Sequence, residues 1–312
     1  MEKLPKNSLL EFHSSTLQDV RNHYSLDDPK RLDEAIDILQ EWARKQTHFT
    51  VTEFERDFLE RMIITNKGLL ERCKKRLDKI CTLRTLMPEF FLPVDVKTMK
   101  SNMECLNIAI MPKLTEENYR VYMLKNFGKQ FSSTFFMDVY KVLISMWQYM
   151  MRHDYHAGFI IVYDMSEANL VDVMTSINLT EFRQIATIIM EGYGARIKDI
   201  YCISSSKLMK TLVDLLKPMV SKKLGDRVQI IEDKNLLKEK ISVEILPSDY
   251  GGKEKSLPEL HQDWFDELSS EDHMEFMKKM SESKTNEAMR QTDKFNEEYL
   301  GMPGTFRSLS VD

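Results

Sequence analysis

The chain has 312 residues, of which 30% are charged and 42% hydrophobic, and its formal net charge is −5 at pH 7. This length suits one large domain with a helical appendage, or two domains, and the composition is that of a globular protein. The acidic balance argues against a general nucleic-acid binder, because neutralising phosphates requires a basic excess.

The sequence also indicates the cellular compartment. The N-terminal residues lack the apolar core of a secretory signal, and no apolar run reaches membrane-spanning length. The cysteines Cys73, Cys81, Cys105 and Cys202 form no CxxC pair, which favours a reduced, intracellular protein with structural thiols. We therefore expect a cytoplasmic protein.

Residues 1–88 read as an N-terminal helical module. Asp28 followed by Pro29 is a typical N-cap and first helical residue, and predicts a helix over Lys30 to Gln46. Thr52 to Glu55 has the pattern of a capping box for the next helix. Asn66 is a candidate cap for a further helix.

Residues 89–262 change in character and predict an α/β domain. The segments 107–110 and 121–124 are candidate strands, and a helix is expected over residues 132–151. The apolar run Phe159 to Asp164 is typical of a strand buried on both faces, as in α/β sheets. A helix over 179–191 and a strand over 228–231 follow, and residues 263–312 are expected to form a charged, peripheral helical tail.

The segment from Glu191 to Asp226 organises this domain. A turn at Gly192 and Gly194 precedes a strand, three serines could cap the next helix, and that helix has an apolar face with a mostly cationic back. One interpretation is a helix packed on a sheet. The other is a lid over an apolar cavity, with an exposed edge that meets an anionic membrane surface.

The residues give no sign of catalytic chemistry. His153, Asp154 and His156 form the one tight group of candidate metal ligands, and no second histidine or cysteine pair completes a site. The glycines of GYGARI precede a strand, whereas a dinucleotide fingerprint follows one. A nucleophile elbow and a Walker loop are also absent from the sequence. We therefore predict no enzyme activity, no cofactor and no metal.

Four motifs occur in a familiar order: GFIIVYDM, GYGARIKDIYCIS, LLKPMVSKKLGDRVQI and LPSDYGG. Together with FERDFLERM and PEFF upstream, they make residues 26–265 resemble the CRAL-TRIO (Sec14-like) family. Within it, the chain is most similar to the branch that contains the α-tocopherol transfer protein and cellular retinaldehyde-binding protein. The resemblance implies a helical N-terminal module and a twisted mixed, largely parallel sheet, with an apolar cavity closed by a helical lid at Lys207 to Leu216.

Two positions depart from the family pattern. Gly194 stands where a proline is usual, which predicts a looser turn. Ile64 stands in place of a second arginine, which removes a cation that helps some relatives to hold a phosphoinositide headgroup. The resemblance therefore implies weaker phosphoinositide binding than in relatives that carry this second arginine.

The resemblance also implies two sets of site residues. The positions implied to line the ligand cavity, each of which ordinary core packing would explain as well, are Tyr140, Leu143, Trp147, Phe159, Tyr163, Ile185, Ile188, Ile189, Tyr193, Ile197, Ile200, Leu208, Leu212 and Leu215. The positions implied to meet a phosphoinositide or membrane surface, which could equally form a solvated charged face, are Arg196, Lys198, Lys217, Lys223 and Arg227.

The predicted function is non-catalytic intracellular carriage of a hydrophobic small molecule by a monomer, with release at an anionic membrane. An isoprenoid such as a tocopherol, retinoid or carotenoid is the first candidate ligand, and a phospholipid is the second. Two alternatives remain at this point: an α/β enzyme with an unrecognised site, and a signalling adaptor.

Overall fold

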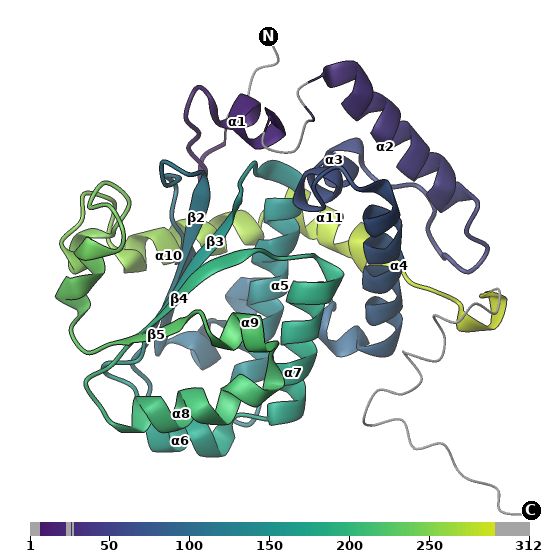
Figure 1. The fold of residues 1–312 in the computed structure, drawn as a ribbon. Helices are drawn as coiled ribbons and strands as arrows, with labels where there is room; N and C mark the ends of the chain where they lie inside the picture. Colours follow the sequence, from purple (N-terminus) through teal and green to yellow (C-terminus); the bar gives the residue numbers. More distant parts are fainter. Residues whose placement is uncertain (1–6, 23–25, 27, 291–312) are drawn as a thin grey trace, which may run out of the picture.

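The computed structural model describes residues 7–22, 26 and 28–290 (Figure 1). Within these residues, the N-terminal part contains α1 (Thr16–Asn22), α2 (Pro29–Arg44), α3 (Arg56–Thr65) and α4 (Leu70–Leu86). The carboxylate of Asp28 accepts a 3.0 Å hydrogen bond from the amide of Lys30, and Pro29 is the first residue of α2. The predicted N-cap is therefore confirmed.

The next two helices begin later than predicted. The segment before α3 is tied to α2, because Gln40 donates to the carbonyl of Thr52 (2.7 Å) and accepts from the amide of Phe54 (3.0 Å). This contact keeps the backbone extended, and no capping box forms at Glu55. Asn66 ends α3 instead of starting α4, since its amide donates to the carbonyl of Met62 (2.8 Å).

A five-stranded sheet forms the centre of the described structure, in the order β1-β2-β3-β4-β5. β1 is antiparallel to β2, and the remaining pairs are parallel, so the predicted mixed, largely parallel sheet is confirmed. The strands are β1 (Leu106–Ile110), β2 (Tyr119–Asn126), β3 (Gly158–Asp164), β4 (Ile197–Ile203) and β5 (Val228–Ile231).

The connections place a layer of helices on one face of this sheet. Each parallel strand is added on the same side of the one before, and right-handed crossovers in a single direction put every connecting helix on the same face. These helices are α5 (Phe135–His153), α6 (Leu170–Ser176), α7 (Leu179–Thr187), α8 (Leu208–Leu216) and α9 (Lys222–Gly225). The space between this layer and the sheet is where a cavity can form.

The C-terminal described residues cover the sheet edge. α10 (Leu257–Leu268) lies along β1, where the indole of Trp264 donates to the carbonyl of Ile110 (2.9 Å). α11 (Glu271–Glu282) buries Phe276 and Met280 in the main core. Residues 263–290 are thus packed, contrary to the expected peripheral tail, and the predicted boundary at 262 lies inside α10. Residues 291–312 of that tail lie outside the described part.

The motif LPSDYGG joins the end of β3 to this C-terminal part. The hydroxyl of Tyr250 donates a 2.6 Å hydrogen bond to the buried carboxylate of Asp164, and Asp249 accepts from the amide of Leu257 (2.9 Å). A Cβ atom on Gly252 would lie 1.8 Å from the carbonyl oxygen of Leu246, so the chain can pass here only without a side chain. Asp164 on β3 and Asp249 in the motif therefore each have a structural partner.

Short helical segments complete the described fold. They are η1 (Pro88–Phe90), η2 (Val96–Met103), the π-helical η3 (Ile188–Gly192), η4 (Lys217–Met219), η5 (Lys234–Glu239), η6 (Ser248–Tyr250) and η7 (Glu287–Met289). Among the described helices, none combines the length and apolar character needed to cross a bilayer.

Candidate functional site

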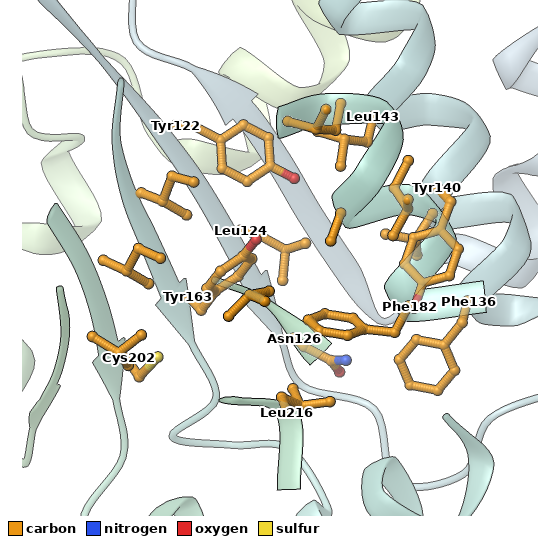
Figure 2. A pocket seen from close by; sticks show the side chains of 18 of the residues that line it. Tyr122, Leu124, Asn126, Phe136, Tyr140, Leu143, Tyr163, Phe182, Cys202 and Leu216 are labelled. Atoms are coloured by element: carbon orange, nitrogen blue, oxygen red, sulfur yellow. The ribbon is translucent and has the colours of Figure 1, made fainter. Parts of the chain in front are cut away.

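An apolar cavity of about 260 Å³ lies between the sheet and the helical layer (Figure 2). Its floor comes from side chains that alternate along β2, β3 and β4, because every second residue of a strand faces the helices. Its walls come from α5 and from α7 with η3, and its cover from α6, α8 and the turn into α9. We call α8 (Leu208–Leu216) the lid helix.

The structure places most of the residues predicted to bind ligand on this cavity. Those on its lining are Tyr140, Leu143, Trp147, Phe159, Tyr163, Ile185, Ile189, Ile197, Ile200 and Leu212. Their positions agree with a ligand-binding role, which remains a proposal.

The other four predicted residues lie away from the lining. Ile188 is fully buried in the main core, and Tyr193 packs behind Trp147, with 6.2 Å between their ring centroids. The lid helix faces the cavity with Met209, Leu212, Val213 and Leu216. Leu208 and Leu215 are seven residues apart and therefore share one flank of the lid, where Leu208 is 39% exposed.

Sequence reasoning missed the contribution of β2. Tyr122, Leu124 and Asn126 line the cavity, and their spacing of two residues was a usable signal for one face of a strand. Phe136 on α5 and Phe182 on α7 were missed as well, although both lie on the lining (Figure 2). Other lining residues absent from the prediction include Leu106, Ile110, Phe135, Val139, Met146, Ile161, Met165, Val173, Ile177, Cys202, Met209, Val213 and Leu216.

Few polar groups face the cavity, and nearly all of them are neutral. Burial raises the pKa of the Cys202 thiol to about 12 and raises the pKa values of Tyr122 and Tyr163 above the usual tyrosine range. Each of these side chains therefore stays protonated at physiological pH. Among the described lining residues Lys217 alone carries a charge, and it lies on the exposed side of the lid.

The lid belongs to a separate, smaller hydrophobic cluster. Its buried residues Met209, Leu212 and Val213 pack with α6, α9 and β4. The main core instead joins the N-terminal helices, α5 and most of the sheet. The lid therefore packs mainly within this smaller cluster, together with α6, α9 and β4.

The five cations predicted to meet a membrane differ in how many contacts they make with other groups of the protein. Arg196 donates to the carbonyls of Ile64 (3.3 Å) and Thr65, and burial lowers its pKa to about 10. Arg227 donates to the carbonyl of Ile197. Lys198 pairs with Glu117 and lies 4.9 Å above the ring of Tyr119. Lys217 and Lys223 are exposed beside the lid.

The candidate metal ligands point into separate contacts. Asp154 forms a fully buried ion pair with Arg120 (2.8 Å), and His156 packs against Phe159 with ring centroids 4.5 Å apart. His153 packs on Tyr149 at 4.4 Å. Over the described ranges, no three acidic, histidine or cysteine side chains gather as a metal site would need.

Comparison with known proteins agrees with this architecture. A family model described as the CRAL/TRIO domain matches residues 96–252, which contain the sheet, the lid and the LPSDYGG motif. The solved "Crystal structure of Sfh5" is 12% identical to this chain, covers 80% of it and 92% of its own length, and superposes with a TM-score of 0.45. The family match spans half of the chain, which therefore belongs to the CRAL/TRIO family of lipid-binding and lipid-transfer proteins.

Proposed function

We propose that this protein binds one hydrophobic small molecule in the cavity under the lid and carries it unchanged, as a monomer, between membranes. The apolar cavity is the observation that carries the proposal. Burying about 300 Å² of apolar ligand surface contributes roughly 7–8 kcal/mol at about 25 cal/mol per Å². Association costs several kcal/mol of this, so tight binding depends on an enclosed site of matching shape.

Carriage requires a part of the structure that opens far enough to load and release the ligand. The lid helix is the best candidate, because its apolar contacts belong to the smaller cluster with α6 and α9. Val171 on α6 is 53% exposed and Leu208 on the lid is 39% exposed, so apolar side chains also face outward here. A membrane that buries these outward side chains would favour the open state.

Lys217 and Lys223 support docking of this region on an anionic surface. Both are exposed beside the lid, and each cation near such a surface contributes about 1 kcal/mol. Arg196 and Arg227 are held by backbone carbonyls, and Lys198 is held by Glu117. These three cations therefore contribute mainly to the overall electrostatic potential of this surface rather than to direct contacts with lipid headgroups. Phosphoinositide binding by this set is a narrower form of the same proposal.

Transfer of a fluorescent lipid from the protein to vesicles tests this docking. The Lys217→Glu/Lys223→Glu variant should transfer more slowly to anionic vesicles and at an unchanged rate to neutral ones. Lys278→Glu/Lys279→Glu on α11 is the matched control, because it makes the same change in net charge away from the lid. Equal rates for both variants on anionic vesicles would exclude electrostatic docking at the lid.

The resemblance to the branch with the α-tocopherol transfer protein favours an isoprenoid ligand. Aromatic side chains line the cavity from β2, α5, β3 and α7, and suit a ring or polyene; they include Tyr140, Trp147, Phe159 and Tyr163. A phospholipid would need its headgroup at the rim, where Lys217 lies. We therefore place the isoprenoid first.

A further inference from the structure

Two tyrosine hydroxyls inside the cavity lack hydrogen-bond partners. The rings of Tyr122 on β2 and Tyr163 on β3 lie in the floor, and Figure 2 shows both hydroxyls directed into the cavity. Neither oxygen has a hydrogen bond to another side chain or backbone group in the described part of the chain. A buried hydroxyl without a partner is unfavourable, so a group that supplies the missing bonds would be stabilised here.

The register of the sheet brings the rings of these two tyrosines together. Tyr163 lies opposite Leu124, so it is the diagonal neighbour of Tyr122 on the same face. The two rings meet edge to face, with 6.3 Å between their centroids and an interplanar angle of 73°. A carbonyl or hydroxyl oxygen has two lone pairs, so one ligand oxygen placed between the two hydroxyls can accept a hydrogen bond from each of them.

Tyr140 provides an internal contrast. Its ring also lines the cavity, but its hydroxyl is enclosed by protein atoms and has no partner within the described residues. A ligand in the cavity contacts the ring of Tyr140 without reaching its oxygen. The two floor tyrosines thus differ from Tyr140 in the accessibility of their donors.

The surroundings of the floor tyrosines exclude a charged ligand group. Among the described residues of the lining, the one charged side chain is Lys217, at the exposed edge of the lid. A carboxylate or phosphate at Tyr122 and Tyr163 would be buried without a cation, which strongly disfavours binding. An uncharged oxygen carries no such penalty.

We infer that Tyr122 and Tyr163 bind the single uncharged oxygen of the ligand, and that the ligand is a long apolar molecule with one hydroxyl or carbonyl group. This inference rests on the proposed carriage of a hydrophobic molecule. The apolar remainder of the ligand extends toward Phe136, Phe182 and Leu216, which lie at the opposite side of the cavity (Figure 2). The cavity thereby selects by polarity as well as by shape.

Binding of four compounds with one farnesyl skeleton to the full chain tests the inference at neutral pH: farnesol, farnesal, the hydrocarbon farnesene and ionised farnesoate. Farnesol and farnesal should bind about 2- to 10-fold more tightly than farnesene, the range expected for hydrogen bonds between neutral groups. Farnesoate should bind least tightly. Tyr122→Phe and Tyr163→Phe should each weaken farnesol and farnesal by a similar factor and leave farnesene unchanged.

The Tyr201→Phe control should leave the affinities of all four compounds unchanged, since Tyr201 on β4 lies between the lining residues Ile200 and Cys202 and therefore faces the other side of the sheet. Unchanged farnesene binding also reports that each variant retains the folded cavity. Three results would overturn the inference while leaving carriage intact. Farnesol and farnesene could bind equally tightly, neither Tyr122→Phe nor Tyr163→Phe could weaken the binding of farnesol, or farnesoate could bind most tightly of the four. Failure of all four compounds to bind the unmodified protein would instead contradict the proposed function.

Discussion

The guanidinium of Arg76 occupies the space beside Gly194 where any other residue would carry its Cβ atom, which would lie 2.8 Å from the guanidinium carbon. From α4, Arg76 donates to the carbonyls of Met190 and Glu191, both at 2.9 Å. These carbonyls end the π-helical segment after α7, where a cation is favourable. The contact therefore joins the N-terminal helical module to a wall of the cavity.

Replacing Gly194 should destabilise the protein. Its φ of +78° lies in the left-handed region, which costs a residue with a side chain about 1–2 kcal/mol, and Arg76 would have to leave its carbonyls. We expect Gly194→Ala to lower the free energy of unfolding by about 2 kcal/mol or more, measured in urea.

Gly225→Ala is the control for this substitution. Its Cβ would lie 3.5 Å from Lys217, which is an ordinary contact, and alanine favours the helical conformation of α9. This variant should be as stable as the unmodified protein or slightly more so. Equal stability of Gly194→Ala and Gly225→Ala would show that the hydrogen bonds of Arg76 do not require a glycine at position 194.

Filling the cavity should block ligand binding without unfolding the protein. Leu143 on α5 faces the cavity, and its neighbour Val142 is fully buried in the main core. Leu143→Trp places the larger side chain in open space, so we expect a loss of at least about tenfold in ligand affinity with a stability change below about 1 kcal/mol.

Val142→Trp should instead destabilise the protein. Overpacking a filled core costs about 1–3 kcal/mol, so this variant should unfold at lower urea concentration. Similar destabilisation by both substitutions would mean that the space beside Leu143 is not open.

The half-buried His153 and the buried His273 predict a loss of stability in acid. Burial, with smaller contributions from Arg152 and Arg61, lowers the pKa of His153 to about 4. Burial and then the charge of His153 lower the pKa of His273 to about 4. In the unfolded chain, these two histidines bind protons near pH 6.5, the usual pKa of histidine. The folded state is favoured while both histidines are neutral in the folded and in the unfolded chain. Their contribution to the free energy of unfolding is therefore complete above about pH 6.5 and is lost as the pH falls toward about 4.

Urea unfolding across this pH range checks the histidine prediction. The free energy of unfolding of the unmodified protein should fall more steeply than that of His153→Gln/His273→Gln. The hydrogen bond of His273 to Ser145 (2.9 Å) would be altered in the variant, so the comparison uses the slope with pH rather than the absolute stability. Equal slopes would contradict neutral imidazoles at these two positions in the folded protein.

The sequence predicted the elements that have a strong local signal. Asp28 with Pro29 marked the start of α2, and the apolar run Phe159 to Asp164 marked the central strand β3. The capping box at Thr52 failed because a distant contact from Gln40 holds that backbone, which local pattern does not report. The packing of α10 on β1 likewise depends on tertiary contacts of Trp264 that its charged neighbours obscured.

The cavity was predictable in outline but not in its details. The apolar arc of the lid helix indicated an inward face, but the rotation that selects Met209 and Leu216 over Leu208 and Leu215 depends on how α8 packs against α6. The turn at Gly194 was expected to be loose. It is instead held by Arg76, more than a hundred residues earlier in the chain. Proline could not adopt the φ found there.

Native mass spectrometry of the purified full chain, followed by organic extraction, tests the central claim most directly. We predict one lipophilic molecule per protein chain, released by extraction and absent from Leu143→Trp. A protein that carries no such molecule and takes up none when incubated with lipid extracts would contradict the existence of an open, ligand-binding cavity beneath the lid helix.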